Sequence, residues 1–314
     1  MADRSLEFSP TIPTVAAQQD DHLWSWRRLL NKTLLYTILV VAAVVAMVPF
    51  LWMISSSLMT LGETINRQWL PTTPQWDNYT RAWRDAQFGD YFLNSVIITG
   101  VTIAGLLFTS IFAAYAFARV KFFGRGVMFT LILSTLMIPE SVIMIPNFLT
   151  VTGRIIPLPQ LHPELPFISF GGSWMNTLSA LTVPFMANAF SIFLLRQFFA
   201  QIPDDLWDAA RIDGSGHLRF LLQIVLPISR PAMLTVTLLT FIGAWNAFLW
   251  PLIVTTRETW RPLMVGLYNF VQEGGTQTHL MMAGSFITII PTLILYFLTQ
   301  KTFTEGIATT GLKG

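Results

Sequence analysis

The stretch DLWDAARIDGSGHLRFLLQIVLP, residues 205–227, lies between two long apolar runs and decides how the rest of the chain is interpreted. Pro203 precedes it, and Asp204 or Asp205 is a suitable helix N-cap, with Asp208 adding negative charge to the first turn. The run Gly214-Ser215-Gly216 ends this helix after about two turns. Because so short a helix is marginal by itself, we expect another structure to pack on it.

The predicted face of this helix suits a protein socket better than a membrane surface. Leu206, Ala209 and Ala210 share one side, and Arg211 lies near the C-terminus. A helix lying on lipid would carry large apolar residues opposite Lys and Arg. Small residues flanked by acids instead favour close approach to a partner's backbone. After the glycines, an amphipathic helix leads to Pro227 and Pro231.

The composition indicates an integral membrane protein. Of 314 residues, 53% are hydrophobic and only 11% are charged, against roughly a quarter charged in ordinary soluble domains. The absence of cysteine excludes disulfides and thiol catalysis, and the four isolated histidines show no metal-ligand spacing. The basic residues are scattered and the net charge is only +2, so no nucleic-acid surface is expected. We therefore predict neither a catalytic nor a metal site.

Six apolar runs are long enough to cross a hydrocarbon core of about 30 Å as helices. They cover residues 33–55, 91–118, 127–150, 174–196, 230–252 and 280–300. The prediction is an all-α membrane protein with a leader at 1–32, a six-helix transmembrane domain at 33–300 and a tail at 301–314. The loop 197–229 contains the quoted stretch.

The Lys and Arg residues predict the orientation, because cytoplasmic loops retain positive charge. Thirteen of the 19 lie in the leader, the tail and the loops on their side of the membrane. The other six are Arg67, Arg81, Arg84, Arg154, Arg257 and Arg261. Both termini and the short helix are therefore expected in the cytoplasm.

Four polar residues are candidates for a translocation path. Glu140 is the single acid inside a predicted span, where a charge costs about 2.5–3.5 kcal/mol, so we expect it to face the bundle interior or to be protonated. A polar contact within a proline-broken helix, or a position near the outer interface, would also explain it. Asn94, Asn188 and Asn246 lie in or at the ends of spans, where amides serve interhelical hydrogen bonds or contact sugars.

The sequence DAARIDGSGHLRFLLQIVLP resembles the signature of binding-protein-dependent ABC importer permeases. That signature reads Glu-Ala-Ala, three residues, Gly, nine residues, Ile, one residue and Leu-Pro. Its positions are occupied by Asp208, Ala209, Ala210, Gly214, Ile224, Leu226 and Pro227, with Asp in place of the usual Glu. The segments WLPTTPQWDNYTRAW, YFLNSVIITG, YAFARVKFFGR, LMIPESVIMIPNF, WNAFLWPLIV and GLKG are similar to carbohydrate-type permeases, specifically the second subunit of a maltose-type pair. A departure occurs at Ala247, where relatives often carry an acid.

The resemblance implies that residues 204–214 form a coupling helix held in a groove of an ATPase subunit. The coupling residues would be Asp204, Asp205, Asp208, Ala209, Ala210, Arg211, Asp213, Gly214, Ile224, Leu226 and Pro227. The implied partners are a homologous second permease, two ATPase subunits, an external solute-binding protein, a sugar and membrane lipid. The implied location is a bacterial or archaeal cytoplasmic membrane.

ATP and Mg would act on the partner ATPase, because this chain shows no phosphate-binding G-x-x-x-x-G-K-[ST] pattern among its few lysines. No cofactor is expected on this chain. The tail is expected either to fray or to reach toward the ATPase.

Two other function classes are alternatives to an importer permease. A secondary transporter would use Glu140 as an ion or proton relay and would be expected to show inverted repeats, which the sequence lacks. An intramembrane enzyme would need a nucleophile or metal ligands, and the spans contain no Cys, His pair or His-Glu motif.

Overall fold

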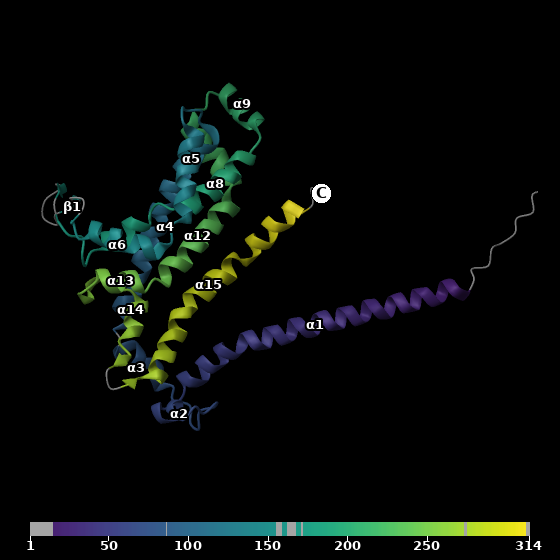
Figure 1. The fold of residues 1–314 in the computed structure, drawn as a ribbon, viewed down its shortest axis with the longest axis vertical. Helices are drawn as coiled ribbons and strands as arrows, with labels where there is room; N and C mark the ends of the chain where they lie inside the picture. The colour runs from purple at the N-terminus through teal and green to yellow at the C-terminus, as the bar shows by residue number, and fades with distance from the viewer. Residues whose placement is uncertain are drawn as a thin grey trace, which may run out of the picture. The chain divides into compact units, whose positions relative to one another are not determined.

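The computed structural model describes residues 15–85, 87–154, 159–161, 168–170, 172–272 and 275–311 (Figure 1). These residues are mostly helical, which confirms the predicted class. Two short antiparallel hairpins also occur: β1 (Pro159–Leu161) pairs with β2 (Ile168–Phe170), and β3 (Val271–Gln272) pairs with β4 (Gly275–Thr276). The chain divides into two compact units, residues 1–55 and 56–314.

The first unit is the greater part of a single long helix, α1 (Val15–Ser57). Its segment Leu29–Ser57 is long and apolar enough to cross a membrane, and it contains the predicted span 33–55. The helix begins inside the predicted leader 1–32, because Ala, Gln, Leu and Arg are good helix formers even where the chain is polar. The leader residues 1–14 lie outside the described part.

The second unit is built around α4 (Phe88–Arg119), which packs most extensively against α8 (Ala189–Gln201) and α12 (Arg230–Trp245). The buried face of α4 is rich in small and hydroxyl side chains, which let helix backbones approach closely. These residues are Ser95, Thr99, Thr102, Ser110 and Ala114. The last helix, α15 (Thr278–Gly311), contacts α12 and α3 (Asp77–Asp85).

Within the described residues, three helices are long enough to span a membrane singly, and three further candidates are pairs of bent helices. The count therefore reaches the predicted six only if each bent pair is one span. The single helices are Leu29–Ser57, Phe88–Arg119 and Thr278–Gln300. The pairs are Arg125–Met137 with Glu140–Val151, Leu178–Phe185 with Ala189–Gln201, and His217–Ile228 with Arg230–Trp245.

The largest departure from the predicted spans lies at 127–150, which is not one helix. It consists of α5 (Arg125–Ser134), the 3-10 turn η1 (Thr135–Met137) and α6 (Glu140–Val151), bent by 103°. Pro139 has no N–H to continue the helix, and the preceding Ile138 is extended, with φ −86° and ψ 120°. The proline therefore divides this apolar run.

Two other predicted spans are also interrupted. The run 174–196 contains α7 (Leu178–Thr182), η2 (Val183–Phe185) and α8, with a bend of 46°. The run 230–252 contains α12 and part of α13 (Leu249–Val254), with the residues around Asn246 between them. The remaining short elements are α2 (Leu61–Ile65), η4 (Glu258–Trp260) and α14 (Leu263–Tyr268).

One of three buried clusters positions the quoted stretch. It gathers the C-terminal half of α4, the end of α8, α9 (Asp204–Ile212), α10 (His217–Phe220), the π-helical turn η3 (Leu221–Val225), α11 (Leu226–Ile228) and α12. Phe199, Phe220 and Val225 are fully buried there. The short helix α9 thus lies on an apolar base at one end of the bundle (Figure 1).

Candidate functional site

The short helix predicted from the sequence forms as α9, but its N-cap differs from the prediction. Pro203, with φ −57° and ψ 142°, holds the cap position, and Asp204 and Asp205 are the first two helical residues. The fixed φ of proline allows it to precede the first turn without a side-chain cap. The two carboxylates face the positive end of the helix dipole, where negative charge is favourable.

The C-terminus of α9 is closed by the predicted glycine. Gly214 adopts φ +73°, a left-handed conformation in which a side chain is strained. Its N–H donates to the carbonyl of Arg211 (3.0 Å), and the N–H of Ser215 donates to that of Ala210 (2.8 Å). These two bonds form a Schellman motif, which satisfies carbonyls left free by the end of the helix.

The face of α9 that contacts the core is not the predicted one. Ala210 is only 5% exposed and Trp207 is half-buried against the same cluster, whereas Leu206 and Ala209 are exposed. Trp207 has the larger apolar area, so positions 207 and 210, spaced i and i+3, take the inner side. The predicted set of Leu206, Ala209 and Ala210 is therefore divided between two faces.

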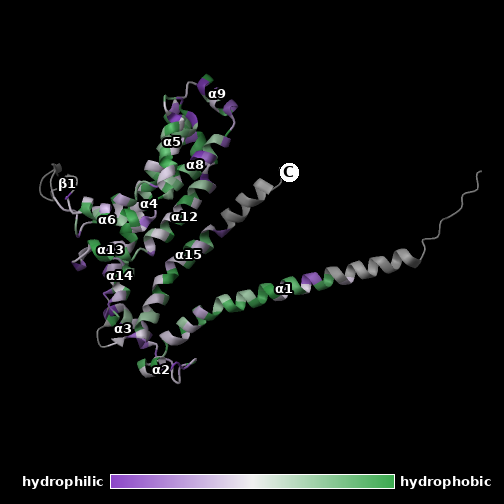
Figure 2. Cartoon of the chain, viewed as in Figure 1, coloured by the Kyte–Doolittle hydropathy of each residue, from purple (hydrophilic) through white to green (hydrophobic). Residues whose placement is uncertain are grey.

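The outer face of α9 is acidic with an apolar end. Four aspartates and one arginine lie between residues 204 and 213, and all five are exposed. Ile212, the last helical residue, is 87% exposed. Figure 2 shows hydrophilic residues on α9 at the end of largely apolar helices. The outer face of α9 thus presents four carboxylates and one exposed isoleucine away from the buried cluster.

Arg119, the last residue of α4, joins α4 to the start of α9. Its Nη1 lies 2.5 Å from Oδ1 of Asp204, its Nε donates to the carbonyl of Phe199 (2.9 Å), and its Nη2 donates to the carbonyl of Ile202. These carbonyls end α8, where a cation is favoured by the helix dipole. The Arg119 side chain is 9% exposed and that of Asp204 is 87% exposed, so the carbonyl bonds are the shielded part of the contact.

A second contact joins α4 to the start of α10, just beyond α9. The hydroxyl of Tyr115 lies 2.8 Å from Nδ1 of His217. The ring of His217 stacks on Trp207, with centroids 4.4 Å apart and planes at 16°. Because Trp207 belongs to α9 and His217 begins α10, this chain of contacts holds the two helices that flank the glycine turn.

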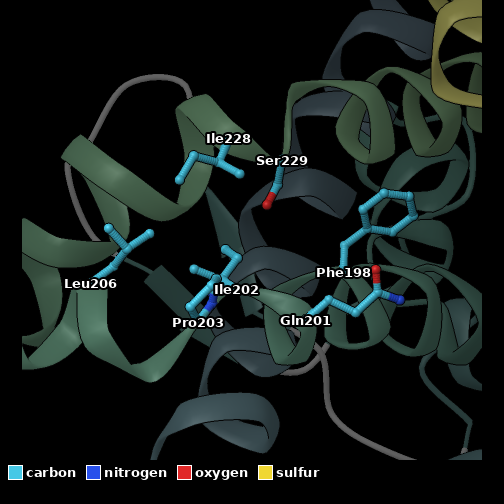
Figure 3. Close-up of a pocket in the computed structure, with 7 residues that line it drawn as sticks. All are labelled: Phe198, Gln201, Ile202, Pro203, Leu206, Ile228 and Ser229. Atoms are coloured by element: carbon cyan, nitrogen blue, oxygen red, sulfur yellow. The ribbon is translucent and has the colours of Figure 1, made fainter. Parts of the chain in front are cut away.

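An apolar recess lies beside the first turn of α9. It measures about 190 Å³ and is lined by Phe198, Gln201, Ile202, Pro203, Leu206, Ile228 and Ser229. Figure 3 shows these side chains, which come from α8, α9 and the junction of α11 with α12. The recess extends the exposed face of α9 by an apolar surface.

The remaining predicted coupling residues lie beyond α9, between it and α12. Ile224 and Leu226 pack against the buried cluster beneath α9, and Pro227 is exposed within α11. This part of the sequence motif connects α9 to α12. The coupling role of all the predicted residues stays a prediction.

The three predicted amides each bond to backbone. Asn94 Nδ2 donates to the carbonyls of Thr259 and Arg261 (both 3.0 Å), and Asn188 Oδ1 caps α8 by accepting from Phe190 N (2.9 Å) and Ser191 N (3.2 Å). Asn246 Nδ2 donates to the carbonyl of Ile242 (2.8 Å). Asn94 is buried, whereas Asn188 and Asn246 are exposed. These bonds give each amide a structural role, and their contact with a solute stays a prediction.

Glu140 does not face the interior of this chain's bundle. It is the first residue of α6, directly after the break at Pro139, and its side chain is exposed. A carboxylate at a helix N-terminus is stabilised by the dipole, which is the structural explanation of its position. The hydrogen bonds of the three amides do not include Glu140, and its place on a translocation path stays a prediction.

Sequence reasoning missed Arg119, Tyr115, Trp207, His217 and Ile212. Arg119 had a signal, since a basic residue ends an apolar run inside the quoted segment YAFARVKFFGR. Its three acceptors lie more than 75 positions away, so no local pattern identifies them. Ile212 follows Ala209 at a helical spacing, which does not reveal that its side chain is exposed.

Comparison with known proteins agrees with this geometry. Residues 105–303 match the family described as binding-protein-dependent transport system inner membrane component. The chain is 32% identical over 246 residues to the sn-glycerol-3-phosphate transport system permease protein UgpE of Yersinia pestis, covering 76% of this chain and 81% of that protein. It is 32% identical over 271 residues to the diacetylchitobiose uptake system permease protein NgcG of Streptomyces coelicolor, covering 85% and 84%.

A solved structure has the same fold. A chain of a bacterial ABC transporter involved in import of the acidic polysaccharide alginate superposes with a TM-score of 0.70 at 24% identity, covering 94% of this chain and 99% of that chain. The family match extends over well over half of the sequence and includes α9 and its anchors. The chain therefore belongs to the binding-protein-dependent transport system inner membrane components, the permease subunits of ABC importers.

Proposed function

We propose that this permease imports a carbohydrate or sugar-like solute and is driven by a separate ATPase that binds α9. The solute class is supported by relatives named for sn-glycerol 3-phosphate and diacetylchitobiose and by the likeness to an alginate importer. All three are polyhydroxylated solutes. The family membership favours this function over a proton-driven transporter that uses Glu140.

The observation that carries the proposal is the outer face of α9. Its inner side is fixed by Trp207 and Ala210, while Ile212 and four aspartates remain exposed. A basic groove with an apolar floor would complement this face, and interfaces of this kind steer and orient their partners through charge. We infer that such a groove belongs to the ATPase.

The proposed mechanism is a two-state permease whose equilibrium the ATPase shifts. Moving a population from 1:99 to 99:1 requires about 5.5 kcal/mol of differential binding. ATP and Mg act on the ATPase, and this chain transmits the movement through α9. A second, homologous permease and two ATPase subunits complete the proposed assembly, with an external binding protein delivering the solute.

The proposed orientation places both termini and α9 in the cytoplasm. The predicted spans put thirteen of the 19 Lys and Arg residues on that side. The ATPase, which needs cytoplasmic ATP, would then meet α9 directly.

The test is uptake by proteoliposomes that contain the assembled complex and its binding protein. Radiolabelled diacetylchitobiose, sn-glycerol 3-phosphate and maltose serve as probes, with ATP supplied on the ATPase side. Asp208→Lys reverses a charge on the exposed face of α9, and we expect it to abolish ATPase copurification and uptake. Asp85→Lys reverses an exposed charge at the end of α3 and is the matched control.

Uptake that persists without ATPase and follows an imposed proton gradient would contradict the proposal. If the Asp208→Lys variant still copurifies fully with the ATPase and still takes up solute, α9 is not the coupling element. ATP-driven uptake of none of the three probes would reject these solutes while leaving the role of α9 intact.

A further inference from the structure

The contacts of α4 with the α9 segment occur at two separate points one helical turn apart. Arg119 bonds to the end of α8 and the first residue of α9, and Tyr115 bonds to His217 beyond the glycine turn. Residues 199–204 and 217 are thereby attached to one rigid helix. A single contact would leave the segment free to pivot, whereas two contacts fix its direction.

The chemistry of Arg119 suits a fixed joint. A guanidinium offers five N–H donors in one plane, and here they reach two backbone carbonyls and one carboxylate on two neighbouring elements. A lysine ammonium is a point charge and cannot cover these three acceptors in the same geometry. The arrangement therefore requires the shape of arginine in addition to its charge.

The second contact is polar and aromatic at once. The Tyr115 hydroxyl meets His217, whose ring lies flat on Trp207, and Trp207 also makes an edge contact with Phe220 at 5.0 Å. Through this stack, Tyr115 of α4 is connected to Trp207 in the middle of α9. Removal of the hydroxyl leaves the aromatic packing and deletes only the bond.

We propose that Arg119 and Tyr115 are positioning residues that fasten α9 to α4 at two points, so that a displacement of α9 by its partner moves α4 with it. This inference rests on the proposed function of α9. Because α4 is the central helix against which α8 and α12 pack, a movement of α4 reaches the body of the permease.

The experiment measures whether α9 and α4 move as one body. The sequence contains no cysteine, so Ala104→Cys on α4 and Leu218→Cys on α10, which the stack of His217 on Trp207 joins to α9, give a single spin-labelled pair at exposed positions outside the proposed coupling residues. The distance distribution is measured by pulsed electron paramagnetic resonance in nanodiscs, for the complex without nucleotide and with ATP and vanadate. The variants are Arg119→Lys, Tyr115→Phe and their combination. Arg125→Lys is the control, because the Arg125 guanidinium donates a long bond of 3.4 Å to the carbonyl of Val120, within its own loop.

We expect one narrow distance that does not change with nucleotide when Arg119 and Tyr115 are intact. The combined variant should broaden the distribution and make it depend on nucleotide, while Arg125→Lys leaves it narrow. Solute uptake per ATP hydrolysed should fall in the same variants. A variant that only folds less well lowers uptake and hydrolysis together and keeps their ratio.

An unchanged narrow distribution in the combined variant would overturn the inference, as would a distance that shifts with nucleotide in the unsubstituted pair. An unchanged ratio of uptake to hydrolysis would overturn it as well. If no ATPase associates with α9, the proposed function fails. The width of the spin-label distance distribution without nucleotide, compared between the variants, still decides whether the two contacts fix the helix. Tyr115→Phe alone keeps the test available if Arg119→Lys does not fold.

Discussion

Gly214 illustrates how a single backbone angle fixes the end of α9. Its φ of +73° belongs to the left-handed region, while Gly216, two residues later, has φ −87° and is the N-cap of α10. A Cβ at either position would meet no atom within 4 Å. The two glycines therefore differ in backbone conformation and hardly in available space.

Gly214→Ala is expected to destabilise the turn by about 1–2 kcal/mol, because an L-residue is strained in the left-handed region. Gly216→Ala is the matched control and should have a much smaller effect on the turn. Hydrogen exchange of the Ser215 amide, which closes the Schellman motif, measures the difference. Equal exchange rates in the two variants would contradict the role assigned to φ at residue 214.

Gly266 is required for a different reason, namely the space beside an aromatic core. A Cβ at this position would lie 2.5 Å from Cδ2 of Tyr91, whose ring is only 1% exposed. We expect Gly266→Ala to lower the free energy of unfolding by about 1–3 kcal/mol through overpacking. Gly100→Ala in α4, where a Cβ meets nothing within 4 Å, should be tolerated. Thermal unfolding of the two variants in detergent compares them.

At the scale of elements, α2 is held by a carboxylate whose protonation would release it. Glu63 Oε2 accepts from Thr60 N and Oε1 accepts from Thr72 N, both at 2.8 Å. The hydrogen bonds from the backbone of Thr60 and then of Thr72 lower the pKa of Glu63 to about 2, from an ordinary value of 4.5. The capping box of α2 and the start of the next loop thus share one acid.

The sign of the pH effect follows from this lowered pKa. The stabilisation is present above the ordinary pKa of 4.5 and is lost as the pH falls through about 2. We expect the amides of Thr60 and Thr72 to lose protection from exchange across that range. Glu63→Gln should expose them at neutral pH and remove most of the acid dependence. Protection that stays constant down to pH 2 in the unsubstituted chain would contradict the account.

The elements show which parts of the fold the sequence can predict. Apolar runs and a glycine stop locate the helices, because these depend on residues close in sequence. The bend at Pro139 also depends on a single local residue. Because the residues on both sides of it are apolar, hydropathy alone predicts one uninterrupted span there. The inner face of α9 is determined by the contact of Trp207 with a cluster formed by α4, α8 and α12. The partners of Arg119 lie at least 80 positions away in the sequence, and the partner of Tyr115 lies 102 positions away. Such tertiary contacts leave no periodic trace.

For the whole molecule, the charge distribution predicts which side of the membrane each loop occupies. Asp205→Cys on α9 and Glu258→Cys in the loop before α14 place single thiols on opposite sides, and both positions are exposed. We expect a membrane-impermeant maleimide to label residue 258 in intact spheroplasts and residue 205 only in inverted vesicles. Acidic side chains were chosen for replacement because they contribute little to topology. The reverse labelling pattern would place α9 outside and remove its access to an ATPase.

The break at Pro139 also affects how this subunit survives before it is assembled. At membrane depth, backbone that leaves the helix must be covered by protein or by a water-filled cavity, since lipid offers no hydrogen bonds. Met137 is 85% exposed, and Ile138 and Glu140 beside it are exposed as well. A chain synthesised without a neighbour would present this opened helix to lipid and to membrane proteases. We therefore expect a copy without its neighbour to be removed faster by these proteases than an assembled one.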